Sequence, residues 1–130
     1  MTTTLDLFAS ALHFHADGDV RVVERQMTGG DSDAWQIAAF RVETDADVHA
    51  DHWEMHPEAD EAVCCLTGGV RLYLRPAEPG GTEDMAQLQA GDAVVVPRGR
   101  WHRLELDAPS TLMSIGRRHG TRLEPRTATH

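Results

Sequence analysis

The stretch that decides the fold lies near the middle of the chain, at residues 52–61, and reads HWEMHPEADE. On a β-strand, His52, Glu54 and His56 would point to the same face, because successive side chains alternate between the two faces. Pro57 cannot donate to a strand ladder, so the strand should end there, and a short turn would bring Glu61 onto the next strand. Imidazole and carboxylate groups bind divalent ions, so this stretch predicts potential metal ligands on two neighbouring strands.

A second stretch, residues 91–102, supplies a further histidine and reads GDAVVVPRGRWH. Its valine run is typical of a buried strand, and a corner rich in proline and glycine follows before a new strand begins near His102. We interpret Gly91, Pro97 and Gly99 as residues that shape this corner rather than contact a ligand. His102 would then complete the set of ligands.

Together the two stretches resemble the paired motifs of the cupin superfamily. The first family motif is G-x5-H-x-H-x3,4-E-x6-G, and at those spacings this chain has Val48, Glu54, His56, Glu61 and Gly68. The second is G-x5-P-x-G-x2-H-x3-N, and at those spacings the chain has Gly91, Pro97, Gly99 and His102, with Leu106 where asparagine is usual. The resemblance covers residues 48–106, which we interpret as the motif-bearing core.

The first motif departs from the family pattern because Glu54 stands in the first histidine position. The usual set of three histidines and one glutamate would become two of each. An alternative register places His52 in the first position, Glu54 in the second and Glu58 in the glutamate position, but it needs glycine where Cys65 stands. In the preferred register His52 would lie about 6.6 Å along the strand from Glu54, close enough to replace it or to contact a metal-bound water.

The resemblance implies an all-β fold, a cupin-type double-stranded β-helix or jelly-roll barrel, with one divalent metal ion held by Glu54, His56, Glu61 and His102. A mixed set of oxygen and nitrogen ligands suits Mn, Fe, Zn or Ni better than Cu(I). Two carboxylates would cancel the charge of a divalent ion and make it a weaker Lewis acid. We therefore expect a small polar ligand that is neutral or weakly charged.

The function predicted from this site is that of a metal-dependent enzyme of the oxygenase, isomerase or lyase type, with His52 and Glu54 as catalytic residues. Arg71, Tyr73 and Arg98 are candidates to orient a substrate at the mouth of the pocket. Two alternatives stay open, a non-catalytic module that binds small molecules and a structural barrel without metal. The glutamate at position 54 and the leucine at position 106 favour the structural alternative.

The whole chain, residues 1–130, is predicted to be a single domain, because its length is about that of one compact unit. Short apolar or β-branched runs predict about nine strands, at residues 20–23, 35–42, 48–56, 61–66, 70–74, 85–88, 93–96, 102–106 and 111–115. In the lead segment, residues 1–20, apolar residues from Leu5 to Leu12 have helical spacing, so a short helix or a strand is expected. Residues 117–130 are predicted to form a last strand and a tail.

The amino-acid composition restricts the kinds of partner that the chain can bind. The chain has 12 basic and 21 acidic residues, a net charge of −9, which disfavours binding to nucleic acid or an anionic membrane. Its only cysteines, Cys64 and Cys65, are adjacent, so a loop-closing disulfide is not expected. The sequence contains no recognisable signal peptide or apolar span, and a cytoplasmic location is predicted. A homodimer is also expected, in which the segment through Val23 covers strand edges, as cupins often pair.

Overall fold

The structure is a computed structural model that describes residues 3–25 and 34–126, and most of its regular structure is β-strand. In chain order the elements are β1 (Ser10–Phe14), β2 (Val20–Glu24), β3 (Trp35–Val42), the 3₁₀ turn η1 (Asp45–Val48), β4 (His52–Met55), β5 (Glu61–Leu74), β6 (Asp84–Gln89), β7 (Ala93–Val96), β8 (His102–Gly116) and β9 (Arg122–Pro125). No helix within the described residues has the length and apolar character that crossing a membrane requires.

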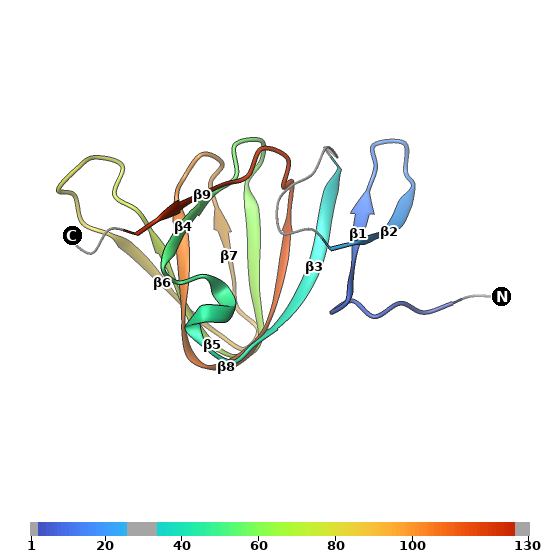
Figure 1. Cartoon of the computed structure of the whole chain (residues 1–130), viewed down its shortest axis with the longest axis horizontal. Coiled ribbons are helices and arrows are strands. Elements are labelled where there is room, and N and C mark those ends of the chain that lie inside the picture. Colours follow the sequence, from blue (N-terminus) through green and yellow to red (C-terminus); the bar gives the residue numbers. More distant parts are fainter. Residues whose placement is uncertain (1–2, 26–33, 127–130) are drawn as a thin grey trace.

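Two long strands, β5 and β8, form the spine of the fold. They pair antiparallel from Ala62 opposite Ile115 to Leu74 opposite His102. Each long strand also takes different partners along its length, β7 and β6 for β5, and β4 and β3 for β8. The sheet therefore curls on itself into a barrel, and the β1–β2 hairpin projects beside β3 at one end of the molecule (Figure 1).

The Gly68-Gly69 pair, expected as a turn between strands 61–66 and 70–74, lies inside the single strand β5. The pairing with β8 shifts register here, which is an irregularity of the β-bulge kind. Gly68 has a φ of +87°, and a Cβ atom at this position would collide with Ser110 of β8. A glycine with positive φ therefore bends the strand instead of reversing the chain. In the same way, the predicted strands 102–106 and 111–115 are one strand, β8.

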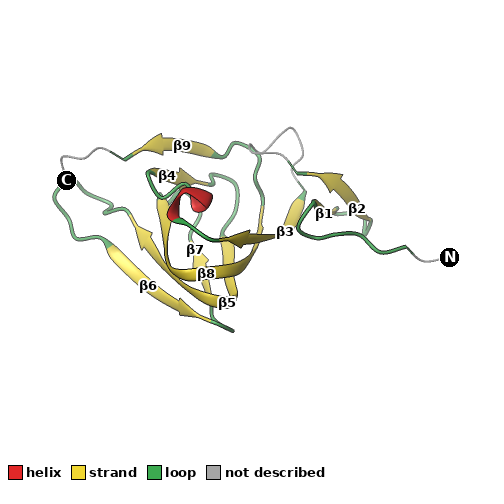
Figure 2. Cartoon of the chain, turned by 60° about the horizontal axis from the view of Figure 1, so that its bottom comes forward, coloured by secondary structure: helices red, strands yellow, loops and turns green. Residues whose placement is uncertain are grey.

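Two other predictions concern the first half of the chain. In the lead segment, where a short helix or a strand was expected, Ser10–Phe14 form strand β1, and Leu12 and Phe14 pair with Ile37 and Trp35 of β3. The predicted strand 48–56 is shorter, since η1 and a turn occupy its first part and β4 begins at His52. The turn η1 packs against β8 and β3, beside β4 in Figure 2, and so lies at the opening of the barrel.

The hydrophobic core lies between the two halves of the curled sheet. Its buried members are Val42, Val63, Cys65, Val70, Leu72, Leu88, Val96 and Leu112. Both cysteines are free thiols, and Cys65 is fully buried in the core as a small apolar residue. Three members of the core, Val42, Val63 and Leu112, also line the cavity of the candidate site described below.

Candidate metal centre

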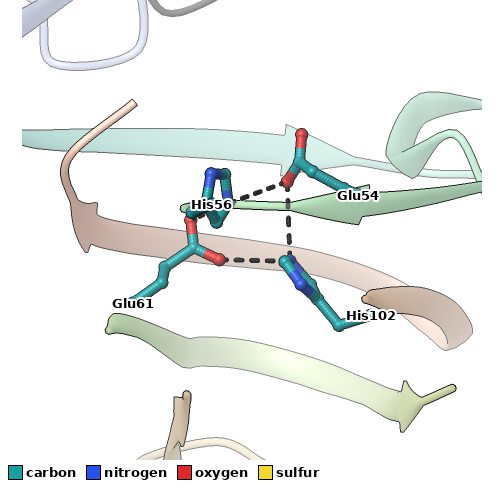
Figure 3. Close-up of side chains that lie close together, drawn as sticks. All are labelled: Glu54, His56, Glu61 and His102. Carbon is teal, nitrogen blue, oxygen red and sulfur yellow. Dashed lines mark ion pairs between the residues drawn. The ribbon is translucent and has the colours of Figure 1, made fainter. Parts of the chain in front are cut away.

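Three strands bring four potential ligands to one point. Glu54 on β4 lies directly opposite His102, the first residue of β8, in the antiparallel ladder. His56 follows the end of β4, and Glu61 is the first residue of β5. Each residue offers one ligand atom, and these four atoms all lie within 4.8 Å of one another (Figure 3). The structure thus brings together the four residues of the preferred sequence register.

The two imidazoles face the two carboxylates. Nε2 of His56 lies 3.2 Å from an oxygen of Glu54 and 3.2 Å from an oxygen of Glu61. Nε2 of His102 lies 3.5 Å from Glu54 and 3.3 Å from Glu61. His56, Glu61 and His102 are each no more than 5% exposed. The cluster is therefore a compact arrangement of two nitrogen and two oxygen donors, of which only Glu54 is partly exposed.

The donor atoms fit a divalent ion. The contacts of the buried Nε2 atom of His56 lack hydrogen-bond geometry, so this atom has no hydrogen-bond partner among the described residues. Its other ring nitrogen, Nδ1, lies 2.8 Å from the Thr121 hydroxyl, and Nδ1 of His102 lies 3.4 Å from the carbonyl oxygen of Arg100. With a proton on each Nδ1, both Nε2 lone pairs would face the centre, as metal-binding histidines require.

The metal-free cluster is a set of opposite charges. Burial alone would raise the pKa of Glu61, but its contacts with His102 and His56 and their positive charges hold the pKa at about 2. Burial would lower the pKa of His102, yet the two glutamates raise it to about 9. The pKa of Glu54 is likewise lowered and that of His56 raised, against the effect of burial. Ionised carboxylates thus face protonated imidazoles, and a metal ion would have to replace those protons.

The loop between β8 and β9 supplies an outer layer of contacts. Nη2 of Arg118 lies 3.2 Å from Oε2 of Glu54, whereas Oε1 of Glu54 faces the two histidines. Thr121, three residues further on, contacts His56. Sequence reasoning missed both residues, because their segment carries no motif and was predicted only as a last strand and tail. Their position follows from the pairing of β4 with β9.

The other candidates lie outside the four-residue cluster. Glu58, a ligand in the alternative register, forms an ion pair of 3.3 Å with Arg117 and also contacts His119. It therefore holds the same loop between β8 and β9 instead of facing the cluster. His52 lines the cavity next to the cluster, and its Nδ1 lies 2.8 Å from Oδ1 of Asp51.

A cavity of about 380 Å³ opens beside the cluster. Glu54, Glu61 and His102 form part of its wall, and His52 and Arg118 also line it. Much of the remaining wall is apolar and includes Phe40, Val42, Val63, Leu104, Leu112 and Leu123. Arg71, Tyr73 and Arg98, expected at the mouth of the pocket, do not line this cavity. The Arg71 side chain instead bonds to Asp107 and Tyr73.

Comparison with solved structures places the fold among the cupins. Oxalate decarboxylase from Bacillus subtilis aligns with a TM-score of 0.52 and 21% identity, over 70% of this chain and 23% of that chain. A cupin-2 domain containing protein from Shewanella frigidimarina aligns with a TM-score of 0.48 and 21% identity, over 76% and 78% of the two chains. The FeII form of HppE aligns with a TM-score of 0.49 and 17% identity, over 63% and 45%.

The chain thus has the cupin fold, as its two motifs predict, and it spans less than a quarter of the length of the oxalate decarboxylase chain. No family model matches the sequence, and no curated protein matches it either.

Proposed function

We propose that the chain binds one divalent transition-metal ion through Glu54, His56, Glu61 and His102, and that it is a metal-dependent enzyme acting on a small organic molecule. The observation that carries the proposal is the convergence of two imidazole nitrogens and two carboxylate oxygens, which all lie within 4.8 Å of one another. A metal ion between the four donors would take the place of the imidazole protons, and it would satisfy the buried Nε2 atom of His56, whose contacts with the two carboxylates lack hydrogen-bond geometry. The adjoining cavity gives such an ion access to a ligand.

The donor set favours Mn, Fe, Zn or Ni. Two imidazole nitrogens and two carboxylate oxygens are neither the soft thiolate set of Cu(I) nor the all-oxygen set of Ca²⁺ and Mg²⁺. Oxalate decarboxylase from Bacillus subtilis, which shares the fold at a TM-score of 0.50 and 21% identity, contains Mn(II) centres. That protein supports the view that this fold can hold a divalent transition metal.

The reaction we propose is of the oxygenase or isomerase type. When bound, a divalent ion supplies a Lewis acid that polarises a substrate oxygen. Because Arg118 contacts the outer oxygen of Glu54, we assign this carboxylate to metal binding and the proton transfer to His52. Asp51 contacts Nδ1 of His52 and would orient the ring so that Nε2 accepts a proton from a substrate in the cavity.

The proposal is tested by screening small organic molecules with metal-loaded protein, following dioxygen consumption for an oxygenase and product spectra for an isomerase. His102→Ala should abolish both metal binding and turnover. His52→Ala should keep the metal but lower kcat by about 100-fold, the usual size of a general-base contribution. His15→Ala serves as the control, because it changes a histidine in the loop between β1 and β2. Turnover that survives in the metal-free His102→Ala protein would contradict a metal-dependent enzyme.

A further inference from the structure

The charge of the site is not set by the two glutamates alone. Arg118 lies in the cavity wall with its side chain 16% exposed, and Nη2 is 3.2 Å from Oε2 of Glu54. Two carboxylates match the charge of a divalent ion, so the guanidinium adds one positive charge to the loaded site. The sequence-based expectation of a neutral ligand considered only the glutamates, since nothing in the sequence placed Arg118 beside them.

Other charged residues in the wall are held by partners of their own. Arg103 bonds to Glu83 and Glu105, so its charge is balanced from outside the cavity. The Asp47 carboxylate accepts hydrogen bonds from the backbone at the start of η1. Arg25 donates to the carbonyl oxygens of Leu7 and Ala39. Arg118 is therefore the cation in direct contact with the four-residue cluster.

The guanidinium of Arg118 can bind an anion and Glu54 at the same time. A guanidinium has five N–H donors in a planar fork, and the Glu54 contact is made by one nitrogen, Nη2. Carboxylates fit the remaining donors well, because the fork offers two parallel hydrogen bonds. A ligand carboxylate beside Arg118 would also lie next to the metal-binding cluster.

The apolar residues of the cavity wall indicate which kind of group the ligand carries besides its charged end. Five apolar residues line the cavity, Phe40, Val42, Val63, Leu104 and Leu112. A cavity of about 380 Å³ is within the size range of small-molecule sites. A small dianion would leave this apolar surface uncovered, whereas an aromatic or branched aliphatic group would fill it.

We infer that the cavity takes a small organic monoanion, a carboxylate with an apolar body, and that Arg118 is the residue that selects for its charge. The inference rests on the proposed function, because the ligand it names is the small molecule that would bind beside the metal ion in the same cavity. It replaces the neutral ligand expected from the sequence with a ligand that has one charged end.

Three probes separate the parts of this inference. Phenylacetate has a carboxylate and an apolar ring, phenylacetamide has nearly the same shape without the charge, and acetate has the charge without the ring. Calorimetry with metal-loaded protein should show phenylacetate binding at least about tenfold more tightly than either of the others. Equal or tighter binding of phenylacetamide would overturn the inference.

Variants of Arg118 test the assigned residue. Arg118→Gln should reduce the preference for phenylacetate over phenylacetamide to less than about threefold, whereas Arg118→Lys, which keeps the charge, should retain most of it. Arg21→Gln, on the exposed β2 strand, removes the same charge far from the cluster and should change nothing. A tenfold preference that survives in Arg118→Gln would show that another group selects the anion.

Elemental analysis of every sample separates the two proposals. Wild-type protein that takes up no metal contradicts the proposed function, whatever its preference among the three probes. Protein that holds metal but prefers phenylacetamide contradicts the inference alone. If Arg118→Gln loses metal, the wild-type comparison of the probes and the Arg118→Lys variant still decide the outcome.

Discussion

The hydroxyl oxygen of Thr121 lies 2.8 Å from Nδ1 of His56, although 65 residues separate the two in the chain. This contact occupies the ring nitrogen that faces away from the cluster, and so it fixes which nitrogen faces the centre. Antiparallel pairing of β9 with β4 brings the two residues together. The C-terminal part of the described chain therefore orients a candidate ligand as well as forming an edge strand of the sheet.

Replacing Thr121 should weaken metal binding without removing a ligand. Thr121→Val keeps the shape of the side chain but loses the hydroxyl, so we expect metal affinity to fall by about 10- to 100-fold, as for other outer partners of metal-binding histidines. Thr121→Ser keeps the hydroxyl and should bind metal nearly as the wild type does. Competition with a fluorescent chelator measures the affinities. Equal affinity of the valine and serine variants would contradict the orienting role.

The metal-free protein should be most stable in a defined pH window. The pKa of Glu61 falls from 4.5 to about 2 on folding, so its contribution is present above pH 4.5 and is lost as pH falls toward 2. The pKa of His102 rises from 6.5 to about 9, so its contribution is present below pH 6.5 and is lost as pH rises toward 9. The free energy of unfolding should therefore be highest between pH 4.5 and 6.5.

Urea unfolding at several pH values checks this window. Glu61→Gln removes a carboxylate that both imidazoles face, so the dependence on pH should become flatter in this variant even if its overall stability changes. A free energy of unfolding that keeps rising between pH 6.5 and 9 in the metal-free wild type would contradict the assigned charges.

Gly68 should tolerate no side chain. Its φ of +87° is unfavourable for other residues, and a Cβ atom there would collide with Ser110 and Pro109. We expect Gly68→Ala to lower the free energy of unfolding by at least about 3 kcal/mol, from backbone strain and overpacking together. Gly18 is the matched control, since its φ is +95° but the space around it is open. Gly18→Ala should cost only about 1–2 kcal/mol, and equal losses would contradict the close approach at Gly68.

We propose that the chain forms a homodimer through the β1–β2 hairpin and β3. Register places Phe14 opposite both Val20 and Trp35, so apolar side chains lie together on one face of these strands. Val20, Val22 and Trp35 are each more than 40% exposed. Exposed apolar patches often mark interaction sites, and a second copy of the chain related by a two-fold axis would cover this one.

Sedimentation velocity tests this dimer. Val22→Lys should shift the protein toward monomer, whereas Val95→Lys, at an exposed position on β7 away from the hairpin, should not. A wild type that is monomeric at micromolar concentration would contradict the proposal.

The sequence predicted the four clustered residues because their motifs lie within strands and corners that are local in the chain. Glu54, His56 and Glu61 are separated by one short turn, and the corner before His102 sets its position on β8. Arg118 and Thr121 could not be predicted in this way. Their proximity depends on the pairing of β9 with β4, a long-range register that no local spacing encodes.

The observed strands and bulge likewise depend on contacts between residues that are distant in the sequence. The glycine pair at residues 68 and 69 is compatible with a turn or a bulge, and packing against Ser110 on β8 determines which one forms. The apolar spacing from Leu5 to Leu12 is compatible with a helix or a strand, and the pairing of Leu12 with Ile37 of β3 favours the strand. In both places tertiary contacts outweigh the local pattern.

The metal content of the purified protein tests the central claim most directly. After growth in medium supplemented with Mn, Fe and Zn, elemental analysis should find close to one transition-metal ion per chain. His102→Ala should contain almost none, and His52→Ala, which changes a cavity residue outside the cluster, should contain as much as the wild type. Wild-type protein without metal, whose melting temperature does not rise when any of these ions is added, would contradict the account.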